Sequence, residues 1–358
     1  MDAMDSRLTN KKKGINQLSY SYYMLCCIFC LLVTALPYWP TYELLIIPKY
    51  ALLFGPRWWL LVCVMCLYLF WRDLSKRQLQ FSVLLVLLSL NYLDFQWPTI
   101  GSYFSVSASP STVQELSVLS ANIGSGGSSK ALDYISFTKY PDIILLQEAR
   151  RINMASLFND YRFKECASGL CIFSQYPFKQ VKTLNRKLFE GWGIFAIFYQ
   201  VNTPFGVISL ANVHFETPRS VLMGLIHRYW DFALASTIES NRQFEAELVS
   251  LGSTNKRHTL IAGDFNMPQD ENIYQRNFSH LSNAVDQKGV GFNATKLTSW
   301  HGVRIDHILY SDDFTLKTVE VIHSINGKYP LKGDHRPVFA TFDVTGINTH
   351  NNKSFAVN

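Results

Sequence analysis

Polar and acidic side chains recur directly after short apolar runs in the last two thirds of the chain, where strand ends are expected to carry chemistry. Such residues suit hydrolysis of a phosphate ester, which needs a hard cation to neutralise phosphoryl oxygens and groups that activate water. One such residue means little, but a set of this size is hard to obtain from folding requirements alone. The set comprises Asn122, Glu148, His214, Asp264, Asn266, Asp306, Asp334 and His335.

The residue types suggest a division of roles. Glu148 follows the apolar run Ile-Ile-Leu-Leu-Gln, which would hold its carboxylate rigidly as a metal ligand. Asp264 and Asn266 lie two apart in an extended segment and can orient and activate a water molecule together. His335 fits the need for a proton donor or cationic group near the phosphate, with a carboxylate to fix its tautomer. The candidates for that carboxylate are Asp306 and Asp334.

The elements that must position these residues are predicted to be short strands separated by turns, with few helices between them. Residues 98–114 are rich in Ser, Pro, Thr and Gly and are predicted to be a linker. Helices are expected over 129–138 and, as one long helix or a pair, over 222–251. Strands are expected over 116–123, 142–147, 170–174, 193–201, 206–213, 259–262, 305–310, 316–322 and 338–344.

The ordered motifs resemble those of the endonuclease/exonuclease/phosphatase superfamily, which includes DNase I, abasic-site endonucleases, inositol polyphosphate 5-phosphatases and neutral sphingomyelinases. The resemblance spans residues 116–345. The motifs, in family order, are Ser-Ala-Asn122, Leu-Leu-Gln-Glu148, Asn-Val-His214, Gly-Asp264-Phe-Asn266, Arg-Ile-Asp306-His-Ile and Gly-Asp334-His335-Arg-Pro.

The resemblance implies an α/β fold: a four-layer α/β sandwich of two packed, mainly antiparallel sheets flanked by helices, formed by residues 115–345. It also implies a Mg²⁺ or Mn²⁺ site. Glu148 would be the principal metal ligand, with Asn122 and Asp334 close to the metal or the phosphate.

The resemblance further implies the catalytic roles. Asp264 and Asn266 would align the attacking water, with Asn266 also close to the phosphate. Asp306 would hold His335 against the phosphate, and His214 would contact the phosphate or assist the leaving group.

One family role has no residue in the expected place. Many members carry an Arg or Tyr on a middle strand that grips the phosphate, but the corresponding run, 191–199, contains no Arg. Arg219 follows His214 closely and is a candidate for substrate contact, with an ordinary surface arginine as the alternative.

The N-terminal third accounts for an unusual composition. Apolar residues make up 48% of the chain and charged residues 17%, whereas about a quarter is typical for charged residues in soluble proteins. Three apolar runs explain the difference and predict a transmembrane region over residues 19–97. The expected helices cover about 20–37, 50–71 and 78–95, and the third, being shortest, is the weakest span.

The distribution of basic residues predicts the orientation of these helices, because positive charge is retained on the cytoplasmic side. Residues 1–18 are therefore expected in the cytoplasm, and the large domain on the periplasmic or extracellular side. If the third run lies in the interface, the large domain would be cytoplasmic instead; a cleaved signal peptide is a further alternative. The basic residues are Arg7, Lys11, Lys12, Lys13, Arg72, Lys76 and Arg77.

Cysteine usage bears on the same question. Five of the seven cysteines lie within the apolar runs, where they behave as small hydrophobic residues. Cys166 and Cys171 are close together and could form a disulfide in an oxidising compartment. A zinc half-site is the alternative, although no second Cys/His pair accompanies it.

These features favour a membrane-tethered phosphoesterase, with the lipid bilayer as a partner and no obligate protein partner. Residues 112–345 hold 23 Lys/Arg and 22 Asp/Glu, so the domain lacks the basic excess of a tight non-specific DNA binder. A lipid head group or small phosphodiester is thus favoured as substrate over nucleic acid. A catalytically inactive membrane scaffold remains the alternative from another class. Residues 346–358 are expected to be a disordered tail.

Overall fold

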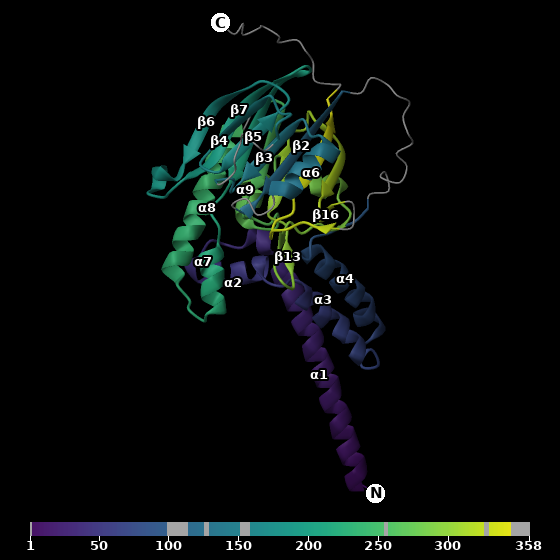
Figure 1. The fold of residues 1–358 in the computed structure, drawn as a ribbon. Helices are drawn as coiled ribbons and strands as arrows, with labels where there is room; N and C mark the ends of the chain where they lie inside the picture. The colour runs from purple at the N-terminus through teal and green to yellow at the C-terminus, as the bar shows by residue number, and fades with distance from the viewer. Residues whose placement is uncertain are drawn as a thin grey trace, which may run out of the picture.

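The computed structural model describes residues 2–98, 114–124, 129–150, 158–253, 257–325 and 329–344. Two six-stranded sheets pack face to face above a group of N-terminal helices (Figure 1). The expected tail lies outside the described residues, as does nearly all of the expected linker.

The first sheet has the strand order β15-β18-β2-β3-β5-β4. Only β2 and β3 are parallel, and the other neighbours are antiparallel. Its central strands Ile143–Gln147 and Leu170–Ser174 are apolar except for their last residue and are buried at every position, so both faces of the sheet are covered here. The strands are β2 (Glu115–Asn122), β3 (Ile143–Gln147), β4 (Phe163–Ala167), β5 (Leu170–Ser174), β15 (Thr315–Val321) and β18 (Val338–Asp343).

The second sheet has the order β10-β14-β9-β8-β7-β6, with β8 and β9 as its one parallel pair. Its strands are β6 (Phe178–Asn185), β7 (Ile194–Thr203), β8 (Gly206–His214), β9 (Thr259–Asp264), β10 (Ser282–Asn283) and β14 (Asp306–Tyr310). Three two-stranded ribbons complete the described strands: β1 (Phe95–Gln96) with β11 (Gly291–Phe292), β12 (Lys296–Leu297) with β13 (Gly302–Val303), and β16 (Ser324–Ile325) with β17 (Tyr329–Pro330).

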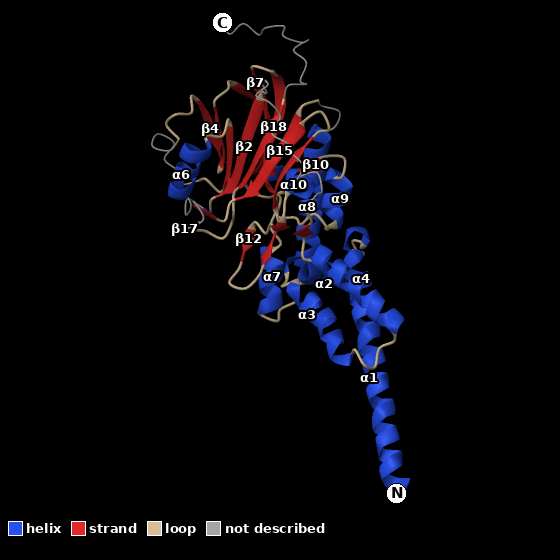
Figure 2. Cartoon of the chain, turned by 90° about the vertical axis from the view of Figure 1, so that its right-hand side faces the viewer, coloured by secondary structure: helices blue, strands red, loops and turns tan. Residues whose placement is uncertain are grey.

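Helices cover the outer face of each sheet and give the four-layer sandwich expected from the sequence (Figure 2). On the first sheet, α6 (Ser129–Lys139) packs through its apolar residues against β2 and β3. On the second, α8 (Phe232–Ser253) and α9 (Asn272–Phe278) pack against β7, β8 and β9. Short α10 (Ala284–Lys288) follows β10. Side chains of both inner faces form one buried core between the sheets.

The N-terminal third is helical, with α1 (Asp2–Thr34), α2 (Glu43–Phe54), α3 (Trp58–Met65) and α4 (Lys76–Tyr92), and with 3-10 turns at Leu36–Tyr38 and Cys66–Phe70. The expected continuous helix over 50–71 is instead divided, and its two parts are bent by 77°. Gly55 and Pro56 cause the break, because proline lacks a backbone N–H and disfavours a helical conformation in the residue before it.

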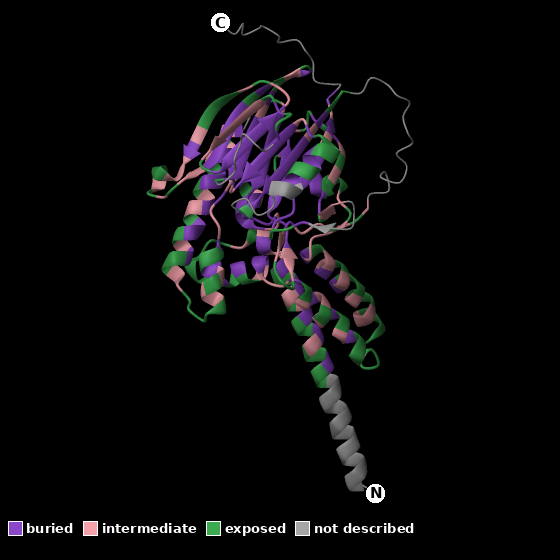
Figure 3. Cartoon of the chain, in the orientation of Figure 1, coloured by how far each residue is buried: buried purple, intermediate pink, exposed green. Residues whose placement is uncertain are grey.

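Gln17–Thr34 is the one described helical stretch that by itself is long and apolar enough to cross a membrane. The segments 43–54 and 58–70 meet the same criterion only when taken as one bent span. Core helices and signal sequences share these properties, so the helix hints at a membrane anchor without establishing one. Its apolar side chains alternate between buried and exposed sides (Figure 3).

The N-terminal helices are joined to the sandwich by buried polar contacts. Lys49 on α2 forms an ion pair with Glu239 on α8, and both side chains are almost fully buried. The Tyr50 hydroxyl donates to Glu239 Oε2 over 2.7 Å. Arg57 pairs with Asp270 over 2.9 Å. Because unpaired buried charges are costly, these contacts fix α2 and the start of α3 against the domain.

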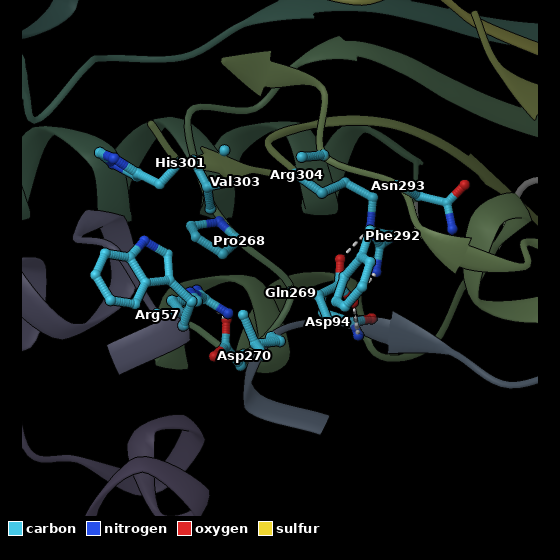
Figure 4. A pocket seen from close by; sticks show the side chains of 14 residues that line it. Arg57, Asp94, Pro268, Gln269, Asp270, Phe292, Asn293, His301, Val303 and Arg304 are labelled. Carbon is cyan, nitrogen blue, oxygen red and sulfur yellow. Dashed lines mark hydrogen bonds and ion pairs between the residues drawn. The ribbon is translucent and has the colours of Figure 1, made fainter. Parts of the chain in front are cut away.

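The same junction encloses a cavity of about 170 Å³ (Figure 4). Its walls carry the Arg57–Asp270 ion pair and the bidentate contact of Arg304 with Asp94. These charges already have partners. None of the eight residues singled out in the sequence as a catalytic set lines this cavity.

Candidate active site

Strand register brings half of the candidate residues to one end of the first sheet. Asn122 pairs with Gln147 across the parallel strands β2 and β3, so Asn122 and Glu148 leave the sheet together. Val338 at the start of β18 pairs with Ser120 near the end of β2. The loop before β18, which carries His335, therefore returns to this same end.

The other half of the candidate residues lie at one end of the second sheet. His214 at the end of β8 pairs with Asp264 at the end of β9. Asp264 also pairs with Asp306 at the start of the antiparallel strand β14. Three neighbouring strands thus present polar residues at one edge, as the motif order predicts.

Hydrogen bonds connect the two sheets at this edge. Asn122 Nδ2 donates to Glu148 Oε1 over 3.1 Å and to Asp264 Oδ2 over 2.9 Å. His214 Nε2 lies 3.7 Å from each of the same two carboxylates. Asn122 Oδ1 accepts from the Gly124 N–H over 3.0 Å, so this amide presents its NH₂ group to the carboxylates.

A histidine–carboxylate pair adjoins this group. His335 Nδ1 lies 2.9 Å from Asp306 Oδ2, which fixes the ring with Nδ1–H donating to the carboxylate. His335 Nε2 lies 3.8 Å from Asp264 Oδ2. The pairing of Asp306 with His335 is therefore the arrangement expected from the sequence, and all three side chains are buried.

Two site residues have left-handed backbone conformations, with φ of 55° at Glu148 and 48° at Asn266. Such conformations are uncommon outside glycine and cluster at functional sites. Asn266 is held by its N–H donating to Asp264 Oδ1 and by its Nδ2 donating to the Phe215 carbonyl, both over 2.8 Å. These contacts fix the direction of the Asn266 side chain.

The pKa values of the two histidines of the site shift in opposite directions. Burial lowers the pKa of His214, although Asp264 and Glu148 oppose the shift, so its neutral form is favoured. Burial also acts against protonation of His335, but the carboxylates of Asp306 and Asp264 outweigh it and raise the pKa of His335 to about 9. Burial and the neighbouring Asp306 raise the pKa of Asp264.

Among the described residues, the side chains of Asp334 and Arg219 make no hydrogen bond or ion pair with Glu148, Asp264 or Asp306. The Asp334 side chain is 55% exposed and forms an ion pair with Lys296. Burial alone would raise the pKa of Asp334, but the hydrogen bond and charge of Lys296 lower it. Arg219 is exposed at the start of α7 (Arg219–Ile226), and its side chain has no ion pair or hydrogen bond to the site among the described residues.

Lys296 lies beside the site although its position in the sequence does not predict this. Its Nζ lies 3.1 Å from His335 Nε2, and its backbone forms an isolated bridge with His335. Lys296 belongs to the short ribbon of β12 and β13, which has no periodic pattern in the sequence, so only the three-dimensional pairing identifies it. Lys296 thus places a cation beside His335, whereas the run 191–199 contains no Arg.

The donor set fits a divalent cation. Asp264, Asp306 and His335 have potential ligand atoms within 4.8 Å of one another, but Asp306 and His335 are hydrogen-bonded to each other, which leaves the Asp264 carboxylate for a cation. Glu148 adds a carboxylate beside Asp264, and among the described residues neither of these two has a Lys or Arg partner. Such an excess of oxygen donors suits Mg²⁺ or Mn²⁺, which prefer carboxylates, rather than a thiolate-binding metal.

Cys166 and Cys171 form a disulfide between the antiparallel strands β4 and β5, with 4.1 Å between their Cα atoms. They are directly opposite each other in the register. The remaining cysteines are free and lie in the N-terminal helices.

A four-layer α/β sandwich with carboxylates, an amide and a histidine–carboxylate pair at one edge is typical of one class of protein, the phosphoester hydrolases that depend on a divalent metal. A profile of the Endonuclease/Exonuclease/phosphatase family matches residues 119–335. The chain belongs to this family, and it is a hydrolase that acts on phosphoester bonds.

Solved structures share the fold. The 3'-5' exonuclease NExo from Neisseria meningitidis is 18% identical, with 64% of this chain and 100% of that chain covered and a TM-score of 0.50. The 3' phosphatase NExo from Neisseria bound to a product DNA hairpin gives 18% identity, 64% and 99% coverage, and the same score of 0.50. No curated protein matches the chain.

Proposed function

We propose that the chain is a membrane-tethered phosphoesterase that hydrolyses a phosphodiester or phosphomonoester by in-line attack of water, with Mg²⁺ or Mn²⁺ bound. The observation that carries the proposal is the meeting of Glu148, Asp264 and His335 across two sheets. Asn122 Nδ2 donates hydrogen bonds of 3.1 Å to Glu148 and 2.9 Å to Asp264, and His335 Nε2 lies 3.8 Å from Asp264 Oδ2.

Glu148 is the principal metal ligand in this proposal, and a bound cation would neutralise charge on the phosphoryl oxygens. Asn122 donates to Glu148 and Asp264 and therefore orients both carboxylates. Asp264 would accept the proton of the attacking water. Its Oδ1 accepts from the Asn266 N–H and its Oδ2 from Asn122, and Oδ2 is the oxygen that lies 3.7 and 3.8 Å from Nε2 of His214 and His335. Asn266 orients the same water.

Three cationic or polar groups would bind the phosphate. His335 is held by Asp306, and its pKa of about 9 favours the protonated ring near neutral pH. Lys296 lies beside His335 Nε2 and can turn from Asp334 toward an anionic oxygen. His214 is favoured as neutral and can assist the leaving group through Nε2. Asp334 would contribute at the outer edge of the site, to the metal or by directing Lys296.

The tether and its orientation are supported by the arrangement of the helices. The α1 N-terminus lies at the far end of the molecule from the sheets, and the turn between α3 and α4 also points away from them (Figure 1). That turn contains Arg72, and Lys76 and Arg77 begin α4, all of them exposed. Both basic clusters thus lie on the side opposite the catalytic domain, which agrees with a cytoplasmic N-terminus and an outward catalytic domain.

The test uses the full chain in detergent or vesicles with Mg²⁺ or Mn²⁺ and bis(p-nitrophenyl) phosphate as a generic diester. Glu148→Gln and His335→Ala should each lose nearly all turnover. The matched controls are Glu247→Gln and His280→Ala, which alter exposed residues outside the site.

Full activity of either site variant would refute the assignment. Absence of metal-dependent turnover on lipid, nucleotide and DNA substrates would favour the inactive scaffold. Preference for DNA over lipid or small diesters would favour a nuclease.

A further inference from the structure

The segment Arg219–Trp230 carries an exposed apolar strip outside the candidate site. Met223, Ile226, Tyr229 and Trp230 are 45%, 71%, 67% and 61% exposed. The opposite side of α7, including Val221, packs into the apolar cluster formed with the N-terminal helices. The strip is thus held firmly in place while its large side chains have no cover among the described residues. Soluble proteins rarely expose several large apolar side chains together unless these bind a partner or a membrane.

The position of α7 indicates what covers the strip. It packs against α2, and it lies beside the N-terminal helices, below the level of the sheets, in two perpendicular views (Figures 1 and 2). The α1 helix contributes Cys30 and Val33 to the same apolar cluster as Val221, and it exposes Ile28 and Leu31, which are 49% and 66% exposed. The strip therefore lies on a helix that packs against the N-terminal helices, and these are the helices proposed to enter the bilayer.

The charge of the segment fits the same environment. Arg219, His227 and Arg228 lie around the strip, and no Asp or Glu occurs from Arg219 to Trp230. Aromatic side chains together with basic ones are typical of segments that lie at the boundary of head groups and acyl chains, where anionic lipids attract the basic residues.

Two further aromatic rings are exposed between the N-terminal helices and the catalytic domain. Trp58 at the start of α3 and Trp300 between β12 and β13 are exposed and contact each other edge to face, with ring centroids 6.1 Å apart. Lys296 of this ribbon lies beside His335. The contact of Trp58 with Trp300 therefore joins α3, one of the N-terminal helices, to the ribbon that reaches the candidate site.

We infer that Arg219–Trp230 is a second membrane contact, inserted into the head-group region of an anionic leaflet, which holds the candidate active site at the lipid surface. The inference rests on the proposed membrane tether. It adds to the tether a contact made by the catalytic domain itself, independent of the crossing helix.

Photo-cross-linking of the full chain in phosphatidylcholine vesicles containing phosphatidylglycerol tests this inference without requiring activity. The photoreactive p-benzoylphenylalanine replaces Ile226 in one variant and Tyr229 in a second, so that one poorly folded variant does not decide the outcome. Ile28 on α1 is the position that reports the tether. Val207 is the matched negative control, because it is 46% exposed at the opposite end of β8 from His214.

Lipid adducts at positions 226, 229 and 28, but not at 207, are the expected result. Adducts at 28 with none at 226 and 229 would overturn the inference and leave the tether intact. No lipid adduct at any position would overturn the tether itself. Adducts from 226 or 229 to a second copy of the chain, in place of lipid, would make the strip a protein interface and overturn the inference as well.

Discussion

The guanidinium of Arg242 donates a 2.6 Å hydrogen bond from Nη2 to the main-chain oxygen of Asn266, a residue of the candidate site. Arg242 is fully buried on α8, and its Nη1 donates to the Tyr50 hydroxyl of α2 over 2.9 Å. Glu271 balances its charge. A single side chain therefore connects an N-terminal helix to a site residue whose backbone is left-handed.

Replacement of Tyr50 by phenylalanine should affect both stability and catalysis. The Tyr50→Phe change removes a hydroxyl bonded to Glu239 and Arg242, which should reduce the free energy of unfolding by about 1–3 kcal/mol. Because Arg242 then loses one of its fixed partners, Asn266 should be held less firmly and kcat should fall while KM changes little. Thermal unfolding and steady-state kinetics measure the two effects.

Tyr42→Phe is the control, since Tyr42 precedes α2 and is 71% exposed. A Tyr50→Phe protein with lower stability and unchanged kcat would show that the Arg242 contact supports the fold alone.

The sequence predicts the sandwich and the edge of the site because each motif follows an apolar run. The run before Glu148 is buried at every position of β3, and Asp264 ends a strand that is equally buried. Parallel register then brings the strand ends together without further information. The order of the motifs along the sequence is therefore enough to predict that Asn122, Glu148, His214 and Asp264 lie close together.

The sequence does not predict contacts that depend on docking between distant segments. Lys49 and Glu239 are 190 positions apart, and nothing local marks them as a buried pair. Lys296 reaches His335 only through a two-residue ribbon. The break after Phe54 has a local signal in Gly55 and Pro56, but the apolar composition of 50–71 outweighed it in the prediction of one helix.

Divalent metal should stabilise the protein against heat. A ligand that binds only the folded state adds about 2.7 kcal/mol at a concentration 100-fold above its Kd. After treatment with a chelator, added Mg²⁺ or Mn²⁺ should therefore raise the Tm of the full chain, and Glu148→Gln should remove most of that rise. Glu247→Gln, on the exposed side of α8, should retain it. An equal rise in Tm for Glu148→Gln and the unaltered chain would exclude Glu148 as the principal ligand.

Removal of the charge on Lys296 should slow hydrolysis. If Lys296 stabilises the anionic transition state, Lys296→Gln should lower kcat/KM by about 100-fold, the usual effect of losing one such group. Lys179→Gln on the exposed strand β6 is the control and should have no effect. The alternative is that Lys296 only neutralises Asp334, in which case adding Asp334→Asn would restore activity. A double-mutant cycle separates the two roles.

His307 should make the protein sensitive to acid. Burial, followed by the nearby Arg304, lowers the pKa of His307 from 6.5 to about 4. The ring is held as neutral, because Nε2–H donates to the Met267 carbonyl over 2.8 Å and Nδ1 faces the Asn283 amide at 3.0 Å. The unfolded chain therefore binds a proton between pH 6.5 and 4 that the folded protein does not.

The stabilisation from neutral His307 is complete above pH 6.5 and decreases as the pH falls, with a total loss of about 3 kcal/mol by pH 4. Chemical denaturation across this range should give a shallower pH dependence for His307→Gln than for the unaltered chain, because the variant lacks the titrating ring. His280→Gln, which alters an exposed histidine, should keep the original slope. If His307→Gln keeps that slope too, the acid sensitivity arises from other groups and the neutral ring contributes nothing to it.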